Sequence, residues 1–137
     1  MDIQFNNLRQ EKDAIGVVFC DNKCRLIGYG KKLDQLSKKY ISNIIKSDIS
    51  FQERNSKNFD YSIIHQPVNL KLSKLYVFKL KNFKDYQIRD FQILGGHLNS
   101  LIKFYKESNV IIYPDGISSS KVSSLNAISE IILGISL

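Results

Sequence analysis

FQILGGHL, residues 91–98, carries two adjacent glycines inside the longest amphipathic pattern of the chain. Around it, apolar residues recur with the three- and four-residue spacing of one buried helical stripe: Ile88, Phe91, Leu94, Leu98, Leu101, Ile102 and Tyr105. Each glycine inside a helix costs about 1 kcal/mol relative to alanine, so Gly95 and Gly96 together cost about 2 kcal/mol. Such a cost is tolerated where another backbone must come close. We therefore expect both glycines to face a neighbouring strand or helix at close range; the alternative is a neutral break that the helix merely tolerates.

The composition is that of one ordinary globular domain. The chain has 137 residues, of which 43% are hydrophobic and 24% charged, close to the average for folded domains. No apolar run approaches the roughly 20 residues of a membrane-spanning helix, and the N-terminus lacks the pattern of a signal peptide. Two cysteines, Cys20 and Cys24, are too few for a disulfide framework. These features predict a cytoplasmic protein with reduced thiols and no membrane contact.

The net charge of +7 admits two interpretations. A lysine and arginine excess can mark a nucleic-acid partner. Here the 20 basic residues are mostly scattered lysines, while alanine occurs only at Ala14 and Ala127. This joint bias is typical of an AT-rich coding background. It favours a solvated surface, with weak DNA contact as the alternative.

Strand and helix patterns alternate along the whole chain. The apolar run 14–20 suits a strand buried on both faces, and 25–28 pairs back to it through the turn 21–23. Further strands are expected near 3–5, 59–65, 74–80 and 110–113, with an irregular polar stretch at 52–58. Helices are expected over 33–45, from about Asp85 to Glu107 with Asn82 or Asp85 as the cap, and near the end. The last helix should bury Val122, Leu125, Ile128, Ile132 and Leu133. This order predicts one α/β domain over residues 1–137, a mixed sheet flanked by helices.

A search for catalytic and metal-binding patterns finds none. The Cys and His residues, Cys20, Cys24, His65 and His97, lack the paired spacing of a zinc site. No phosphate loop, dinucleotide-binding glycine motif or nucleophile elbow occurs. We predict no catalytic residue and no metal ligand in this chain. A set of aromatic residues follows apolar patterns and is expected in the core rather than on a base-stacking platform: Tyr76, Phe78, Phe91, Phe104 and Tyr105.

Short segments occur in an order that is similar to one known module. They are the strand 14–20, the segment 44–51, the strand 75–78, the glycine-bearing helix 91–102 and the terminal segment 127–134. This order resembles the N-terminal domain of the leucyl (cytosol) aminopeptidase family, in which a strand ending "GLG" precedes a helix bearing "aGG" and a helix with "EGxxLG" closes the domain. Three departures are visible: LKNF at 80–83 replaces "GLG", the segment after Phe51 lacks the family's glycine, and Ile131 follows Glu130 in place of glycine.

The resemblance implies a function for a longer polypeptide. It implies a macro-domain-like three-layer sandwich without catalytic residues, which helps to build a hexamer and in some bacterial members contacts DNA. The catalytic domain of such enzymes follows it, carries "NTDAEGR" and "KGxTFDSGG"-like segments, and uses two divalent metals (manganese, zinc or magnesium) to remove N-terminal residues from peptides. We expect that domain to follow Leu137. The alternative is a basic macro-like module that contacts nucleic acid or a nucleotide, although no glycine-rich loop is present to cradle a diphosphate.

Overall fold

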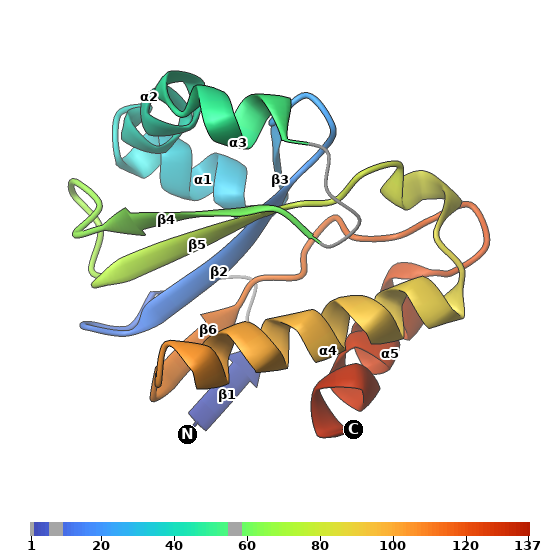
Figure 1. Cartoon of the computed structure of the whole chain (residues 1–137). Helices are drawn as coiled ribbons and strands as arrows, with labels where there is room; N and C mark the ends of the chain where they lie inside the picture. Colours follow the sequence, from blue (N-terminus) through green and yellow to red (C-terminus); the bar gives the residue numbers. More distant parts are fainter. Residues whose placement is uncertain (1, 6–9, 55–58) are drawn as a thin grey trace.

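The computed structural model describes residues 2–5, 10–54 and 59–137 and forms three layers, a central sheet between two groups of helices (Figure 1). The sheet has six strands, in the order β1-β6-β2-β5-β4, with β3 paired to β2. β1, β6, β2 and β5 are mutually parallel, whereas β3 and β4 run antiparallel to their neighbours. The strands are β1 Asp2–Phe5, β2 Ile15–Cys20, β3 Leu26–Ile27, β4 Tyr61–His65, β5 Lys74–Lys79 and β6 Asn109–Ile112. The predicted mixed sheet flanked by helices is confirmed.

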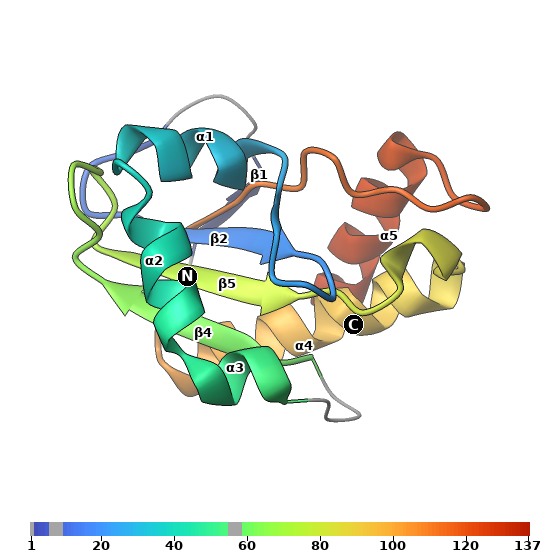
Figure 2. The same ribbon diagram turned by 90° about the horizontal axis from the view of Figure 1, so that it is seen from above.

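The helices divide between the two faces of the sheet (Figures 1 and 2). α1 Tyr29–Leu36, α2 Tyr40–Ser47 and α3 Ile49–Glu53 cover one face. α4 Ile88–Phe104 and α5 Ser124–Ser136 cover the other, and the short 3-10 turn η1 Phe83–Asp85 leads into α4. No helix of the described residues is long and apolar enough to cross a membrane.

The central strand β2 serves two cores at once. All six of its residues are buried, because successive side chains of a strand point to opposite faces and both faces are covered. Val17 and Phe19 pack in the core beneath α4 and α5, and Val18 and Cys20 in the core beneath α1 to α3. The interpretation of run 14–20 as a doubly buried strand is confirmed.

Three helix boundaries differ from the sequence prediction. The expected helix over 33–45 is two helices, since Lys38 and Lys39 adopt positive φ angles of 55° and 65°. The stretch 52–58 was expected to be irregular, but α3 extends into it as far as Glu53. Residues 55–58 of this stretch lie outside the described residues. α4 begins at Ile88, where the side chains of Gln87 and Asp90 form a reciprocal capping box; neither Asn82 nor Asp85 caps it.

α4 and α5 cross with their backbones in contact at the glycines. A methyl group on Gly95 would overlap the carbonyl oxygen of Ile131, and one on Gly134 would overlap that of Gln92. At Gly96 an added Cβ would lie 3.9 Å from the carbonyl oxygen of Gly134, an ordinary van der Waals contact. The close approach expected at both glycines is therefore found at Gly95, while Gly96 has room for a side chain.

This crossing also decides which face of α5 is buried. The side facing α4 and the sheet carries Ala127, Ile131 and Gly134, whereas Leu125, Ile132 and Leu133 are exposed. Val122, just before α5, is buried as expected and Ile128 is half-buried. The expectation was wrong for Leu125, Ile132 and Leu133, because backbone contact selects small residues at the crossing and these larger ones turn outward.

Candidate ligand cleft

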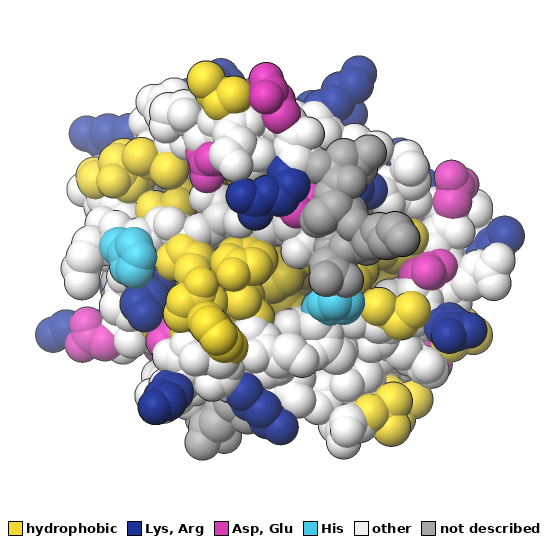
Figure 3. All heavy atoms as spheres, viewed as in Figure 1, with side chains coloured by type: hydrophobic (Ala, Val, Ile, Leu, Met, Phe, Trp, Pro, Cys, Tyr) yellow, Lys and Arg dark blue, Asp and Glu magenta, His cyan; other side chains and the backbone are white. Residues whose placement is uncertain are grey.

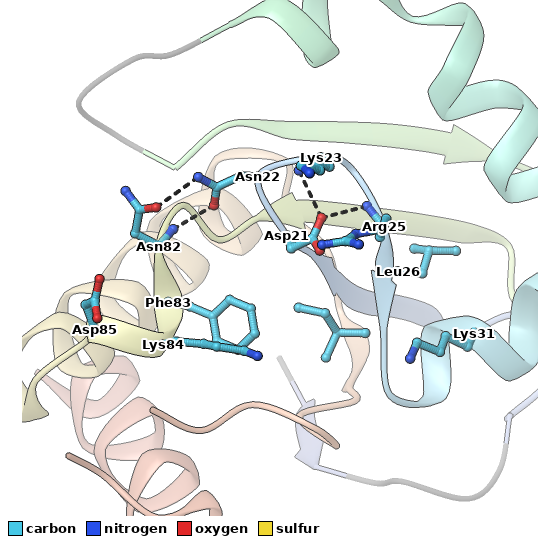
Figure 4. A pocket seen from close by; sticks show the side chains of 11 residues that line it. Asp21, Asn22, Lys23, Arg25, Leu26, Lys31, Asn82, Phe83, Lys84 and Asp85 are labelled. Atoms are coloured by element: carbon cyan, nitrogen blue, oxygen red, sulfur yellow. Dashed lines mark hydrogen bonds and ion pairs between the residues drawn. The ribbon is translucent and has the colours of Figure 1, made fainter. Parts of the chain in front are cut away.

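A cleft of about 600 Å³ opens where two parallel strands end side by side (Figure 4). From the carboxyl end of β2 the chain passes through β3 to α1 on one face, and from that of β5 it passes to α4 on the other. In open α/β sheets such a reversal of direction leaves a crevice in which ligands bind. The walls are the turn after β2, strand β3, the start of α1 and the connection from β5 to α4.

Asp21 shapes the turn that forms one wall. Its Oδ1 accepts hydrogen bonds from the backbone N–H groups of Lys23 and Arg25, each at 2.9 Å, and its Oδ2 accepts one from Arg25 Nε at 2.8 Å. Burial alone would raise the pKa of Asp21, but these hydrogen bonds stabilise the carboxylate and lower its pKa below the ordinary value. The carboxylate thus holds the tight turn and fixes the guanidinium of Arg25 at the edge of the cleft.

Two asparagines join the opposite walls. Asn22 Oδ1 accepts from the backbone N–H of Asn82 at 2.7 Å, and Asn22 Nδ2 donates to Asn82 Oδ1 at 3.0 Å (Figure 4). Asn82 adopts a left-handed conformation, with φ of 52°, which asparagine tolerates better than most residues. This pair, the Asn22–Asn82 clamp, fixes the position of the β5–α4 connection relative to the turn after β2.

Cations outnumber acids around the cleft. Lys23, Arg25, Lys31 and Lys84 line it together with Asp21 and Asp85. The side chains of Lys31 and Lys84 point toward each other from opposite walls (Figure 4). Like charges that face each other repel unless an anion lies between them, so the cleft has the charge distribution of an anion site.

A third loop packs against the segment that joins β3 to α1. Gly28 and Gly116 have positive φ angles of 59° and 81°, and a methyl group on Gly28 would overlap the backbone of Asp115. The loop after β6 therefore lies directly against the start of α1. Only glycine accommodates both this backbone conformation and this contact.

One lysine beside the cleft is buried, contrary to the expectation of a solvated basic surface. Lys79, at the end of β5, is 2% exposed, and its Nζ donates to the carbonyl oxygens of Phe51, Gln52 and Arg54. Nζ also lies 4.8 Å from the centre of the Phe51 ring. Lys79 thus ties the carboxyl end of α3 to the sheet, since a cation complements the last carbonyls of a helix.

The residues singled out from sequence do not gather in one site. Gly95 and Gly96 belong to α4, outside the cleft lining, and His65 is exposed at the end of β4. His97 packs edge to face on Phe59, with ring centres 5.2 Å apart. Cys20 and Cys24 are free thiols at the hairpin, and burial raises the pKa of both. Among the described residues, no three His, Cys, Asp or Glu side chains come together as metal ligands would.

The aromatic residues predicted for the core separate into two groups. Tyr76, Phe78 and Phe91 are buried as predicted. Phe104 is 76% exposed and Tyr105 38% exposed, so the prediction was wrong for these two. Phe104, the last residue of α4, lies outside the buried stripe of that helix, whereas the half-exposed ring of Tyr105 still packs edge to face on Tyr76 of the sheet, with ring centres 6.1 Å apart.

Comparisons with known proteins support the fold and nothing finer. No protein-family model matches the chain, and no curated protein matches it. Among solved structures, the macrodomain of Mycobacterium tuberculosis DarG is similar, with a TM-score of 0.65 over 98% of this chain and 90% of that chain. The two share 11% sequence identity. The chain therefore has a macrodomain-like α/β fold.

Proposed function

We propose that this chain is the N-terminal, non-catalytic domain of a metal-dependent aminopeptidase of the leucyl (cytosol) type, and that it serves assembly or regulation. The observation that carries the proposal joins two short motifs of the resemblance. The helix with the double glycine and the terminal helix ending in Leu133-Gly134 cross through Gly95 and Gly134. Gly95 and Gly134 are thus needed for the same reason, because a side chain at either would collide with the backbone of the other helix. The macrodomain-like fold also agrees with the fold that the resemblance implies.

Under this proposal the chemistry belongs to a following catalytic domain. The two divalent metals, manganese, zinc or magnesium, would be held there and would activate the water that attacks the peptide. The described residues of this chain offer no set of three ligands for them, so no catalytic step is assigned to its side chains. The partners are the chain's own catalytic domain, further copies in a hexamer in the cytoplasm, and peptide substrates of the whole enzyme.

Assays of two polypeptides test the proposal. The longer gene product should release p-nitroaniline from leucine p-nitroanilide when Mn²⁺ or Zn²⁺ is supplied, and should lose activity with a chelator. Residues 1–137 alone should show no turnover and no stoichiometric tight metal binding by calorimetry. Turnover or tight stoichiometric binding by residues 1–137, or an inactive longer product, would contradict the proposal.

A second candidate function rests on the cleft. The facing ammonium groups of Lys31 and Lys84 favour a phosphate-bearing ligand, a nucleotide or nucleic acid, in a binding module rather than an enzyme part. A thermal shift of several degrees with ADP-ribose, or submicromolar affinity for duplex DNA at physiological salt, would support this candidate. If the chain is an aminopeptidase domain, duplex binding should be no tighter than about 10⁻⁵ M and should weaken steeply with salt, as non-specific binding does.

A further inference from the structure

Strand β4 is an edge of the sheet that remains open to a further strand. Among the strands of the described residues, β5 alone pairs with it. The backbone bonds Lys79 N–H to Asp60 O and Gln66 N–H to Ser73 O fix the phase of this antiparallel pair. Because hydrogen-bonded and non-hydrogen-bonded pairs alternate, the N–H and C=O groups of Tyr61, Ile63 and His65 point away from β5. Residues 61–65 contain no lysine or proline, the residue types that commonly prevent an edge strand from pairing with another chain.

An aromatic groove lies between this edge and α4. A hollow of about 350 Å³ is lined by Phe59, Tyr61, Phe78, His97, Ser100, Leu101 and Phe104. Figure 3 shows hydrophobic side chains gathered in the middle of this face of the molecule. Phe104 projects into solvent at the end of α4, and an apolar surface of this kind marks a place where another molecule binds.

Most of the exposed charges near the groove are positive; the exposed acid among the described residues there is Glu53, which adjoins Arg54. Arg54, Lys103 and Lys106 are exposed. Two other acids are paired and buried: Asp60 lies beside Lys81 and Arg54, and Glu107 is held by Lys74 at 3.2 Å and by the hydroxyl of Tyr76. A second copy of the chain would bring like charges together, whereas an acidic segment would be attracted.

We propose that β4 and the aromatic groove bind an extended, acidic segment of a partner polypeptide. Its backbone would pair with the outward N–H and C=O groups of Tyr61, Ile63 and His65, and alternate apolar side chains would enter the groove. Strand addition of this type takes affinity from the main chain and specificity from pockets for every second side chain. This inference is independent of the aminopeptidase proposal.

A peptide titration followed by NMR tests the inference. The probe is a six-residue peptide that alternates aspartate with phenylalanine or isoleucine, added to the ¹⁵N-labelled chain. Saturable shift changes should concentrate on the amides of Tyr61, Ile63 and His65. A peptide with lysine in place of aspartate should bind at least about tenfold more weakly, and N-methylation of the peptide amides that face β4 should abolish binding.

Two matched variants locate the site. Phe104→Ser should lower the affinity for the peptide at least about tenfold. The control Leu125→Ser removes a similarly exposed apolar side chain from α5 and should leave the affinity unchanged. The spectrum of each free variant reports its folding. The inference is overturned by absent or unsaturable shifts, by shifts elsewhere on the chain, by equal binding of the lysine peptide, or by a concentration-dependent dimer through β4.

Discussion

The α4–α5 crossing and the Asn22–Asn82 clamp both join segments that lie far apart in the sequence, by opposite physical means. At the crossing, side chains are removed so that Gly95 and Gly134 let two backbones touch in the core. At the clamp, side chains are supplied so that two loops share exposed hydrogen bonds. A buried backbone contact leaves no room for adjustment, whereas an exposed polar contact competes with water. The first should therefore be intolerant of substitution and the second forgiving.

The largest effect is expected at the crossing itself. Gly95→Leu should lower the free energy of unfolding by about 1–3 kcal/mol, because the side chain overpacks against the Ile131 carbonyl. The measurement is urea denaturation followed by circular dichroism. Gly96→Ala is the matched control and should be neutral, or stabilising by up to about 1 kcal/mol, since alanine favours the helix. An equal loss at both positions would show that the close approach is not specific to Gly95.

A smaller effect is expected at the clamp. Asn22→Ala removes both hydrogen bonds to Asn82 and should cost about 0.5–1.5 kcal/mol of unfolding free energy. Asn126→Ala, at an exposed asparagine on α5, provides the control in the same denaturation assay. A cost at Asn22 above about 1.5 kcal/mol, or one larger than that of Gly95→Leu, would contradict the distinction between the two contacts.

The turn that carries the clamp should respond to acid. The pKa of Asp21 is lowered in the folded state from its ordinary value of 3.8. The ionised carboxylate therefore stabilises the fold fully at pH values above 3.8. That contribution is lost as the pH falls through the folded pKa. The stability difference between the wild type and Asp21→Asn should therefore shrink when denaturation at about pH 6 is compared with denaturation at about pH 3. A constant difference would show that the ionised carboxylate does not hold the turn.

The smallest effect is expected at a residue that belongs to neither contact. Phe104→Ser should change the free energy of unfolding by less than about 0.5 kcal/mol, because the ring is largely exposed. The same denaturation assay measures it. A loss comparable with that of Gly95→Leu would mean that Phe104 is packed and that the aromatic groove is closed.

The sequence predicted the crossing better than the clamp for a physical reason. A glycine inside a helical stripe is locally unfavourable, so Gly95 points to a distant partner even when that partner is unknown. Asn22 and Asn82 lie in turns, where asparagine is ordinary, and nothing local indicates that they meet. The sequence likewise predicts Lys31 and Lys84 to be ordinary solvated lysines, because only the fold brings their side chains to face each other.

Periodicity failed where the surroundings of an element, rather than its own pattern, decided burial. The runs of β2 and β5 lie deep in the sheet, and their burial follows from composition. On α4, Phe104 lies outside the buried stripe and faces solvent, although it is apolar. On α5, periodicity favoured Leu125 because it is large, whereas contact with α4 requires Gly134. Buried Lys79 gave no signal, since its carbonyl partners come from α3.

The proposal that this chain is the N-terminal domain of a leucyl-type aminopeptidase is tested most directly by reading the coding sequence after the codon for Leu137. Under this proposal the reading frame continues into a second domain carrying an "NTDAEGR" segment and a "KGxTFDSGG"-like segment. A stop codon directly after Leu137, or a following domain without these segments, would contradict it.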